Sequence, residues 1–193
     1  MIFVRLSFVF LFFITYSQKM ILGYKNTELL LCLIPILLLL LQIIPSLLLL
    51  WKRNLELDGN DLRIKVIGHQ WYWSYELGDI GDLAFDSYIK PINELRLGEL
   101  IFLEVDNRLI LPVRVRIRFI LSSSDVIHSW ALPSFFIKLD CISGILTVFS
   151  YFFNIVGLYF GQCSEICGAN HSFIPVVLEV TLFDFFKEWL KTI

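Results

Sequence analysis

The sequence predicts an N-terminal two-helix transmembrane hairpin over residues 1–53 and an all-β sandwich or barrel over residues 54–193. The longest apolar runs lie before Trp51, and one of them is long enough to cross a bilayer. After residue 60, apolar and polar residues alternate in several short segments, as they do in half-buried strands. The formal net charge of −2 argues against a nucleic-acid partner.

The first helix is expected over residues 1–17, which are apolar apart from Arg5 and a few Ser and Thr positions. A signal peptide has a similar pattern, but no small-residue cleavage site follows this segment. We therefore expect a transmembrane helix here. Because about 16 residues are short for a membrane span, we expect part of this helix to precede Met1.

The second helix is expected over residues 29–51, which are almost wholly Leu and Ile. About 23 residues with a rise of 1.5 Å each extend roughly 34 Å, enough to cross a bilayer with some tilt. Pro35 and Pro45 are tolerated where a neighbouring helix compensates for the lost backbone hydrogen bonds. The Trp-Lys-Arg sequence at 51–53 forms an interfacial end.

The remaining elements are short. Strands are expected at 62–66, 100–105, 113–119 and 176–182. Turns are expected at 58–60, 78–79 and 106–107, where Asp, Gly and Asn gather. A short helix over about 182–191 closes the chain. Many short strands imply a sandwich or barrel.

Two of the four cysteines, Cys163 and Cys167, lie four residues apart, and His171 follows four residues later. A disulfide between them would fit an oxidising compartment, but the flanking histidine fits metal binding better. A further ligand must come from elsewhere, and His128, just after a predicted strand, is the best candidate. The only other histidine, His69, lies beside an aromatic cluster.

This ligand set leaves two metals open. A structural zinc site uses two cysteines and two histidines, but usually as a Cys pair followed by a separate His pair. Here cysteine and histidine are interleaved on one loop. Thiolate and imidazole also suit copper, and two cysteines on one loop could bridge two copper ions. The electron would then be shared between both metals. The spacing favours copper without excluding zinc.

Gly161–Phe173, GQCSEICGANHSF, resembles the CuA sequence of cytochrome c oxidase subunit II. Four further segments resemble the same family in order. They are Gly68–Glu76, Phe85–Tyr88, Leu103–Arg108 and Asp125–Ala131. The resemblance extends from about Glu28 to Trp189, and it implies that the β domain is cupredoxin-like.

The resemblance also implies the roles of individual residues. His128, Cys163, Cys167 and His171 match the ligands of two copper ions in a CuA centre. Glu165 matches the residue whose main-chain carbonyl binds one copper and whose carboxylate reaches a magnesium ion shared with subunit I.

Ile174 departs from the family, which has methionine there as a weak axial copper ligand. Isoleucine offers no sulfur, so a true isoleucine removes the axial bond and shifts the redox potential, upward by our expectation. Alternatively, the codon is AUA, which some mitochondrial codes read as methionine. The chain has only 2 methionines, which favours this second explanation.

The aromatic residues Trp71, Tyr72 and Trp73 could simply pack in the core. Alternation along a strand would place Trp71 and Trp73 on one face and Tyr72 on the other. In the family, the first Trp of this motif is where electrons from cytochrome c enter. The resemblance therefore gives this role to Trp71, with Tyr72 adjacent.

Acidic residues near this motif predict a docking surface, although a solvated loop would explain those of the segment 76–86 equally well. Cytochrome c is basic, so an acidic surface would steer it and speed association. Asp79 and Asp82 belong to that segment, and Ser124 replaces an acidic residue that is common in relatives. The residues expected to dock the partner are Glu76, Asp86, Asp106 and Asp125.

Glu28 lies where the second helix begins. A carboxylate at a membrane boundary is often an anchor, but in the family a glutamate here opens a proton-uptake path into subunit I. The resemblance thus implies an oxidase subunit that takes electrons from cytochrome c at CuA and passes them to haem in subunit I. Oxygen reduction and proton pumping would follow there. Its expected partners are cytochrome c, subunit I, other oxidase subunits and the lipid bilayer.

Other classes share some of these features. A quinol oxidase subunit II has the hairpin and fold without copper, and the intact ligand set argues against it. Nitrous oxide reductase has the copper site but no hairpin, and a zinc-stabilised binding domain would need only the ligands. The Phe- and Leu-rich composition predicts the mitochondrial inner membrane, with the copper domain in the intermembrane space. A bacterial plasma membrane is the alternative.

Overall fold

The computed structural model describes residues 23–55, 62–79, 81 and 83–193. The chain divides into two units at the bond between Asn54 and Leu55. The helix expected over residues 1–17 and the turn expected at 58–60 lie outside the described residues, as does Asp82.

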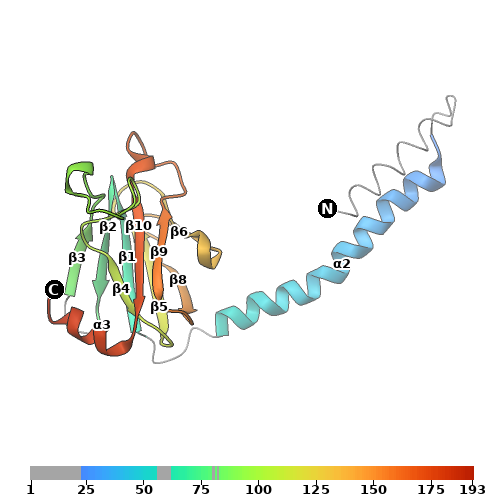
Figure 1. Cartoon of the computed structure of the whole chain (residues 1–193). Coiled ribbons are helices and arrows are strands. Elements are labelled where there is room, and N and C mark those ends of the chain that lie inside the picture. Colours follow the sequence, from blue (N-terminus) through green and yellow to red (C-terminus); the bar gives the residue numbers. More distant parts are fainter. Residues whose placement is uncertain (1–22, 56–61, 80, 82) are drawn as a thin grey trace. The chain divides into compact units, whose positions relative to one another are not determined.

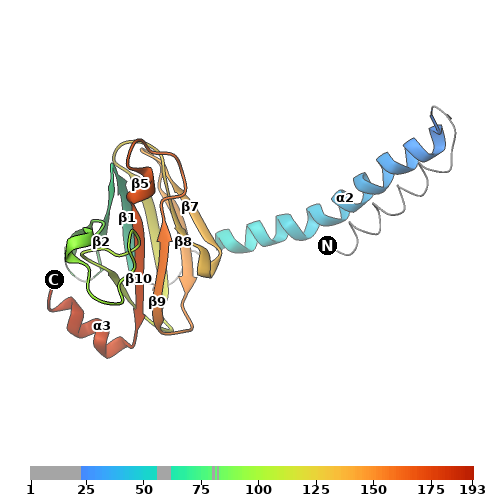
Figure 2. The ribbon, with the colours of Figure 1, turned by 45° about the horizontal axis from the view of Figure 1, so that its top comes forward.

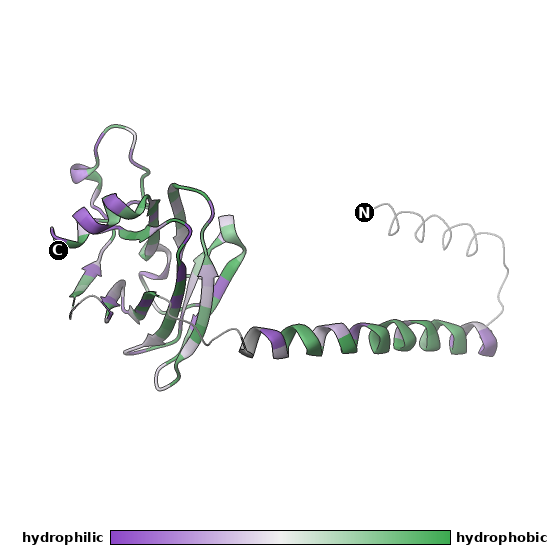
Figure 3. Ribbon diagram, turned by 90° about the horizontal axis from the view of Figure 1, so that it is seen from below, coloured by the Kyte–Doolittle hydropathy of each residue, from purple (hydrophilic) through white to green (hydrophobic). Residues whose placement is uncertain are grey.

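The described part of the first unit is one helix, α2, over Lys25–Leu55 (Figure 1). It is longer than the predicted 29–51 and contains Pro35 and Pro45 in its interior. Its side chains from Leu29 to Trp51 are exposed, and Figure 3 shows that they are hydrophobic over most of its length. By length and composition, Lys25–Lys52 could cross a membrane, with a mean hydropathy of 2.7. A helix that is apolar all round requires lipid or other helices around it.

The second unit is a β-sandwich (Figures 1 and 2). Its five-stranded sheet has the order β3-β2-β1-β5-β8, a three-stranded sheet has the order β4-β10-β9, and β6 pairs with β7. The strands are β1 Leu62–His69, β2 Tyr72–Leu77, β3 Leu83–Ser87, β4 Leu109–Pro112, β5 Arg116–Ser123, β6 His128–Leu132, β7 Ile137–Cys141, β8 Thr147–Phe152, β9 Gly157–Gln162 and β10 Pro175–Thr181. Short 3-10 helices occupy Ile92–Glu94, Pro133–Phe135 and His171–Phe173, and α3 occupies Phe183–Leu190.

The core lies between the sheets and follows from the alternation of the strands. In β1, Ile64 and Val66 are buried while Arg63 is exposed. The two largest buried side chains, Trp73 of β2 and Trp130 of β6, are completely inaccessible to solvent. The indole of Trp130 donates a hydrogen bond of 3.3 Å to the hydroxyl of Tyr75, which satisfies its polar atom inside the core.

Two strand predictions need correction. The segment 100–105 is not a strand, because Phe102 has φ +65° and the backbone turns there. The strand predicted to start at residue 113 starts at Arg116, because Arg114 has φ +59° and leaves the extended conformation. The strands expected from 62 and from 176, and the closing helix, are confirmed with small shifts of their ends.

Strand β10 connects the two ends of the domain. β10 begins at the loop 163–174 and ends next to α3, so this loop and the closing helix lie at opposite ends (Figures 1 and 2).

Candidate metal centre

The predicted metal ligands meet at the end of the domain where β9 leads into the loop 163–174. Cys163 directly follows β9, and His128 is the first residue of β6. The backbone N–H of Cys163 donates to the carbonyl of Ile174 at 3.0 Å, and that of Ser164 donates to the carbonyl of Ser129 at 2.9 Å. These bonds hold both ends of the loop against the sandwich and place it beside β6.

Gly161 explains how β9 approaches β6 so closely. A Cβ added at this residue would lie 1.8 Å from the carbonyl oxygen of Ala131, far inside any real contact. Only glycine therefore lets the strand pass at this distance, and the next turn of the chain brings Cys163 to His128.

The ligand atoms form two sulfur–nitrogen pairs. The sulfur of Cys163 lies 3.9 Å from Nδ1 of His128, and the sulfur of Cys167 lies 3.5 Å from Nδ1 of His171. The two sulfurs are 3.9 Å apart. One ligand atom from each of His128, Cys163 and Cys167 lies within 4.8 Å of the other two. The arrangement brings together all four predicted side-chain ligands.

Both loop cysteines are free thiols. Burial raises the pKa of Cys163, but its contacts with His128 and with the backbone lower it by more, so the net shift is downward. Burial and the nearby charge of Cys163 raise the pKa of Cys167. A metal ion binds the thiolate form of both cysteines, so its binding would release their protons.

Asp125 fixes the orientation of the His128 ring. Its Oδ1 lies 2.8 Å from Nε2 of His128, so the ring donates its Nε2–H to this carboxylate. Nδ1, which faces the sulfur of Cys163, then carries the free lone pair that a metal requires. Sequence reasoning assigned Asp125 only to docking and missed this contact, which depends on the turn between β5 and β6.

Glu165 and Ile174 complete the loop. The carbonyl oxygen of Glu165 lies 3.4 Å from the sulfur of Cys163, where the resemblance expects a main-chain ligand, and its side chain is exposed. Ile174 is 1% exposed and packs in the same buried cluster as both loop cysteines.

Trp71 contacts the metal loop directly, although not from a strand. It lies in the turn between β1 and β2, so the expectation that it shares a strand face with Trp73 is wrong. Its indole donates to the carbonyl of Cys167 at 3.3 Å. Tyr72 instead stacks on His69 and on Tyr88, with ring centroids 4.4 and 4.3 Å away.

The predicted docking carboxylates differ in their surroundings. Asp86 and Asp106 are exposed, and Tyr88 donates to both, from its hydroxyl at 3.4 Å and from its backbone at 2.8 Å. Glu76 is half-buried and pairs with Lys65 at 2.9 Å, which reduces its field. Glu28 lies in the first turn of α2, in the other unit of the chain.

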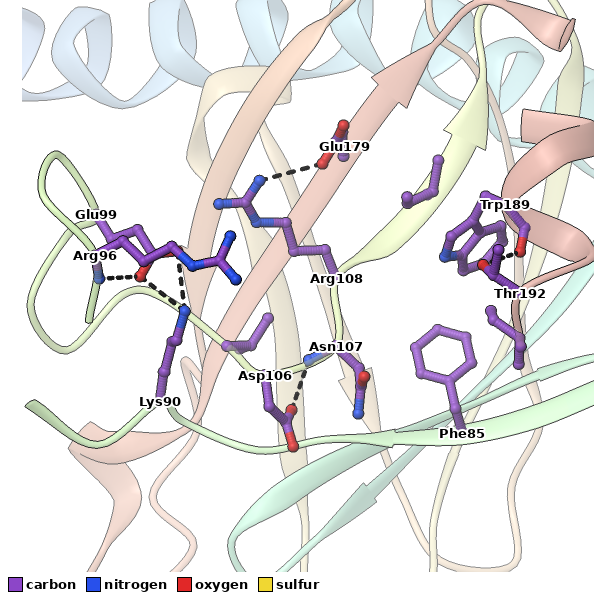
Figure 4. Close-up of a pocket in the computed structure, with 13 residues that line it drawn as sticks. Phe85, Lys90, Arg96, Glu99, Asp106, Asn107, Arg108, Glu179, Trp189 and Thr192 are labelled. Carbon is purple, nitrogen blue, oxygen red and sulfur yellow. Dashed lines mark hydrogen bonds and ion pairs between the residues drawn. The ribbon is translucent and has the colours of Figure 1, made fainter. Parts of the chain in front are cut away.

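A cavity of about 450 Å³ lies away from the cluster, between the segment 90–108 and α3 (Figure 4). Two of its cations are already neutralised. Lys90 pairs with Glu99 at 2.8 Å, and Arg108 pairs with Glu104 at 2.8 Å and Glu179 at 3.2 Å. These ion pairs connect loop and sandwich, and the cavity offers no set of metal ligands.

Comparisons with known proteins show the family of the chain. The family described as cytochrome c oxidase subunit II, periplasmic domain, matches residues 62–181. Cytochrome c oxidase subunit 2 of Ascaris suum is 55% identical over 188 residues, covering 97% of this chain and 81% of that protein. The same subunit of Caenorhabditis elegans is 54% identical over 191 residues, covering 98% and 82%.

Solved structures show the same fold. The periplasmic domain of subunit II of cytochrome oxidase of Bradyrhizobium japonicum has a TM-score of 0.64 and 38% identity, covering 70% of this chain and 94% of that chain. A mixed disulfide intermediate between a thioredoxin-like protein and subunit II of cytochrome c oxidase has a TM-score of 0.61 and 41% identity, covering 72% and 95%.

Proposed function

The chain belongs to the cytochrome c oxidase subunit II family and is thus a subunit of a haem-copper terminal oxidase, and from this premise we propose how it works. It accepts single electrons from reduced cytochrome c at a two-copper CuA centre. It passes them to haem in subunit I, where oxygen is reduced and protons are pumped.

The observation that carries this proposal is the pairing of each sulfur with one imidazole nitrogen. Cys163 faces Nδ1 of His128, and Cys167 faces Nδ1 of His171. Cys163, Cys167, His128 and His171 would hold a pair of copper ions, because thiolate and imidazole are ligands that suit copper. When bound, such a pair supplies one-electron redox chemistry with little change of geometry. The carbonyl of Glu165 is placed to add an oxygen ligand.

Residues around the ligands orient the site and keep water out of it. Asp125 keeps the His128 ring in one tautomer, and the buried wall around Ile174 excludes water from the cysteines. Trp71 presents an indole to the metal loop and receives the electron from the partner, with Tyr72 beside it. Exposed carboxylates at Asp86, Asp106 and Asp125 steer the basic cytochrome c.

The same premise supports the remaining roles. The Glu165 carboxylate contributes to a magnesium site shared with subunit I, and Glu28 begins a proton path into that subunit. Residues 1–17 form a second span that pairs with α2 as a hairpin. The chain then resides in the mitochondrial inner membrane, with the β domain in the intermembrane space and other oxidase subunits around it.

The redox state of the cysteines controls assembly. A subunit II relative forms a mixed disulfide with a thioredoxin-like protein, as its structure records. In this chain the two sulfurs are 3.9 Å apart, close enough that a small movement would allow oxidation to a disulfide. Reduction by a dithiol protein therefore precedes copper loading in our proposal.

Metal analysis tests this function. We expect two coppers per chain and a mixed-valence EPR signal shared equally by both ions. Cys163→Ser should abolish that signal, whereas Cys32→Ser, in the exposed apolar helix, should leave it unchanged. One zinc per chain, bound tetrahedrally by the same four residues, would contradict the proposal and support a structural site.

A further inference from the structure

The turn between β1 and β2 is tied to both halves of the metal centre through one residue, Gln70. Its side-chain amide donates to the carbonyl of Cys167 at 2.8 Å. Its backbone N–H donates to Oδ2 of Asp125 at 2.7 Å, and Oδ1 of that carboxylate accepts from His128 at 2.8 Å. Gln70 thus contacts the cysteine loop directly and the histidine through one carboxylate.

The hydrogen bond from Gln70 is the shorter of two that reach the same oxygen. The indole of Trp71 also donates to the Cys167 carbonyl, but at 3.3 Å. A bond of 2.8 Å is near the optimum for N–H···O, and one of 3.3 Å is beyond the usual range. The position of Trp71 on the loop therefore depends more on its neighbour Gln70 than on its own bond.

Two glycines keep this contact close. A Cβ at Gly168 would lie 3.1 Å from the amide nitrogen of Gln70 and 3.3 Å from the Trp71 ring, and Gly168 has φ +119°. A Cβ at Gly68 would lie 2.8 Å from the ring of His128. Gly168 therefore lets the turn and the loop meet with no side chain between them, and Gly68 lets β1 lie against His128.

We propose that Gln70 is a positioning residue that holds Trp71 against the Cys167 loop and thereby sets the rate at which an electron passes from Trp71 to the metal centre. Gln70 contacts none of the proposed metal positions and acts through the carbonyl of Cys167 and the carboxylate of Asp125. The inference rests on the proposed copper function, and it concerns only how the point of electron uptake is coupled to that centre.

The matched pair Gln70→Met and Gln162→Met tests this role in the intact oxidase. Methionine keeps the length of the side chain but has no N–H donor. Gln162 is exposed at the end of β9, where the hydroxyl of Ser164 donates to its backbone carbonyl at 3.3 Å. Because a change of side chain leaves that backbone carbonyl in place, Gln162→Met is the control. Gln70→Asn, which keeps an amide donor on a shorter chain, serves as the milder second variant.

For Gln70→Met we expect both coppers to remain and the electron transfer from bound cytochrome c to slow about tenfold, as misplacement of a reacting group does. The KM for cytochrome c should stay within about twofold of the unsubstituted oxidase. The copper–sulfur vibrations should shift, because the Cys167 carbonyl loses a donor. Hydrogen–deuterium exchange of the segment 68–74 should increase, and Gln162→Met should change none of these.

Three results would overturn the inference. An unchanged transfer rate with unchanged exchange shows that Gln70 does not hold the turn. A change confined to KM shows a docking residue. Copper loss from both Gln70→Met and Gln70→Asn shows a structural requirement for the site. Failure of the proposed function is read separately, from the unsubstituted oxidase, as zinc in place of copper or no reduction by cytochrome c.

Discussion

At the scale of single residues, the carboxylates near the metal centre divide by what they contact. Asp125 accepts hydrogen bonds from the His128 ring and from the backbone of Gln70, and these bonds lower its pKa against the opposing effect of its partial burial. Asp86 accepts from the hydroxyls of Ser74 and Tyr88 and contacts no ligand. One carboxylate therefore supports the site, and the other contributes charge to the surface.

Asp86→Asn and Asp125→Ala should separate these contributions. Asp86→Asn should slow cytochrome c oxidation at low salt only, because ions screen exposed charges beyond about 10 Å at 0.1 M. Asp125→Ala should also weaken copper binding about 10- to 100-fold at either salt, as loss of a partner to a metal-bound histidine does. Copper content and oxidation rates at two salt concentrations measure both effects. Full copper affinity in Asp125→Ala would contradict the supporting role.

Ile174 is the residue at which the sequence itself is in question. It is 1% exposed, and its carbonyl accepts from the backbone of Cys163, so the side chain at this position lies against the metal loop. We expect the mass of the peptide that contains residue 174 to be that of methionine. If the peptide shows isoleucine, Ile174→Met should lower the redox potential by adding an axial sulfur, and its cost in stability should stay below about 1.5 kcal/mol.

At the scale of elements, local pattern predicted several strands and the turn at 78–79, and it missed the turn inside the segment 100–105. The alternation of apolar and polar residues identified β1, and the apolar segment from residue 176 identified β10, because each strand packs side chains in the core. The apolar run at 100–105 resembles a strand, but the backbone turns there so that Glu104, 2% exposed, can pair with Arg108. Arg108 in turn pairs with Glu179, 71 positions away, and no local pattern encodes a contact at that separation.

The metal site divides in the same way. The spacing of Cys163, Cys167 and His171 made this ligand set predictable, because the three lie on one short loop. The contacts of Gln70 were not predictable, since they join residues 55 and 97 positions apart in the chain. Such contacts depend on the order of strands in the sheet and not on spacing within a segment.

Gly161→Ala should show how far the site depends on the packing of β9. The new methyl group would overlap the Ala131 carbonyl, so β9 must move away from β6 and carry Cys163 away from His128. We expect a loss of about 3 kcal/mol in the free energy of unfolding, the upper range for overpacking, together with loss of copper. Gly78→Ala is the control, because nothing lies within 4 Å of a Cβ there. Equal thermal unfolding and copper content in both variants would refute the explanation.

At the scale of the whole molecule, the metal centre and the hydrophobic core have different origins. The core is formed by side chains from both sheets, among them Trp73, Phe119 and Leu178, which are completely buried and are not predicted ligands. The ligands lie at one end of this core, and Cys163 and Cys167 contribute only their small thiols to it. A β domain built in this way does not need metal to fold, unlike small domains whose structure depends on zinc.

Removal of the metal tests this separation. When a chelator strips the reduced full-length chain in detergent, we expect the β-sheet signal in far-ultraviolet circular dichroism to remain. The midpoint of thermal unfolding should fall by roughly 10 °C, because a ligand bound a thousandfold above its dissociation constant contributes about 4 kcal/mol to the folded state. Adding copper back should restore both the midpoint and the mixed-valence signal. If the β structure were lost on chelation, the metal would be part of the core, and the zinc-stabilised domain would become the better description.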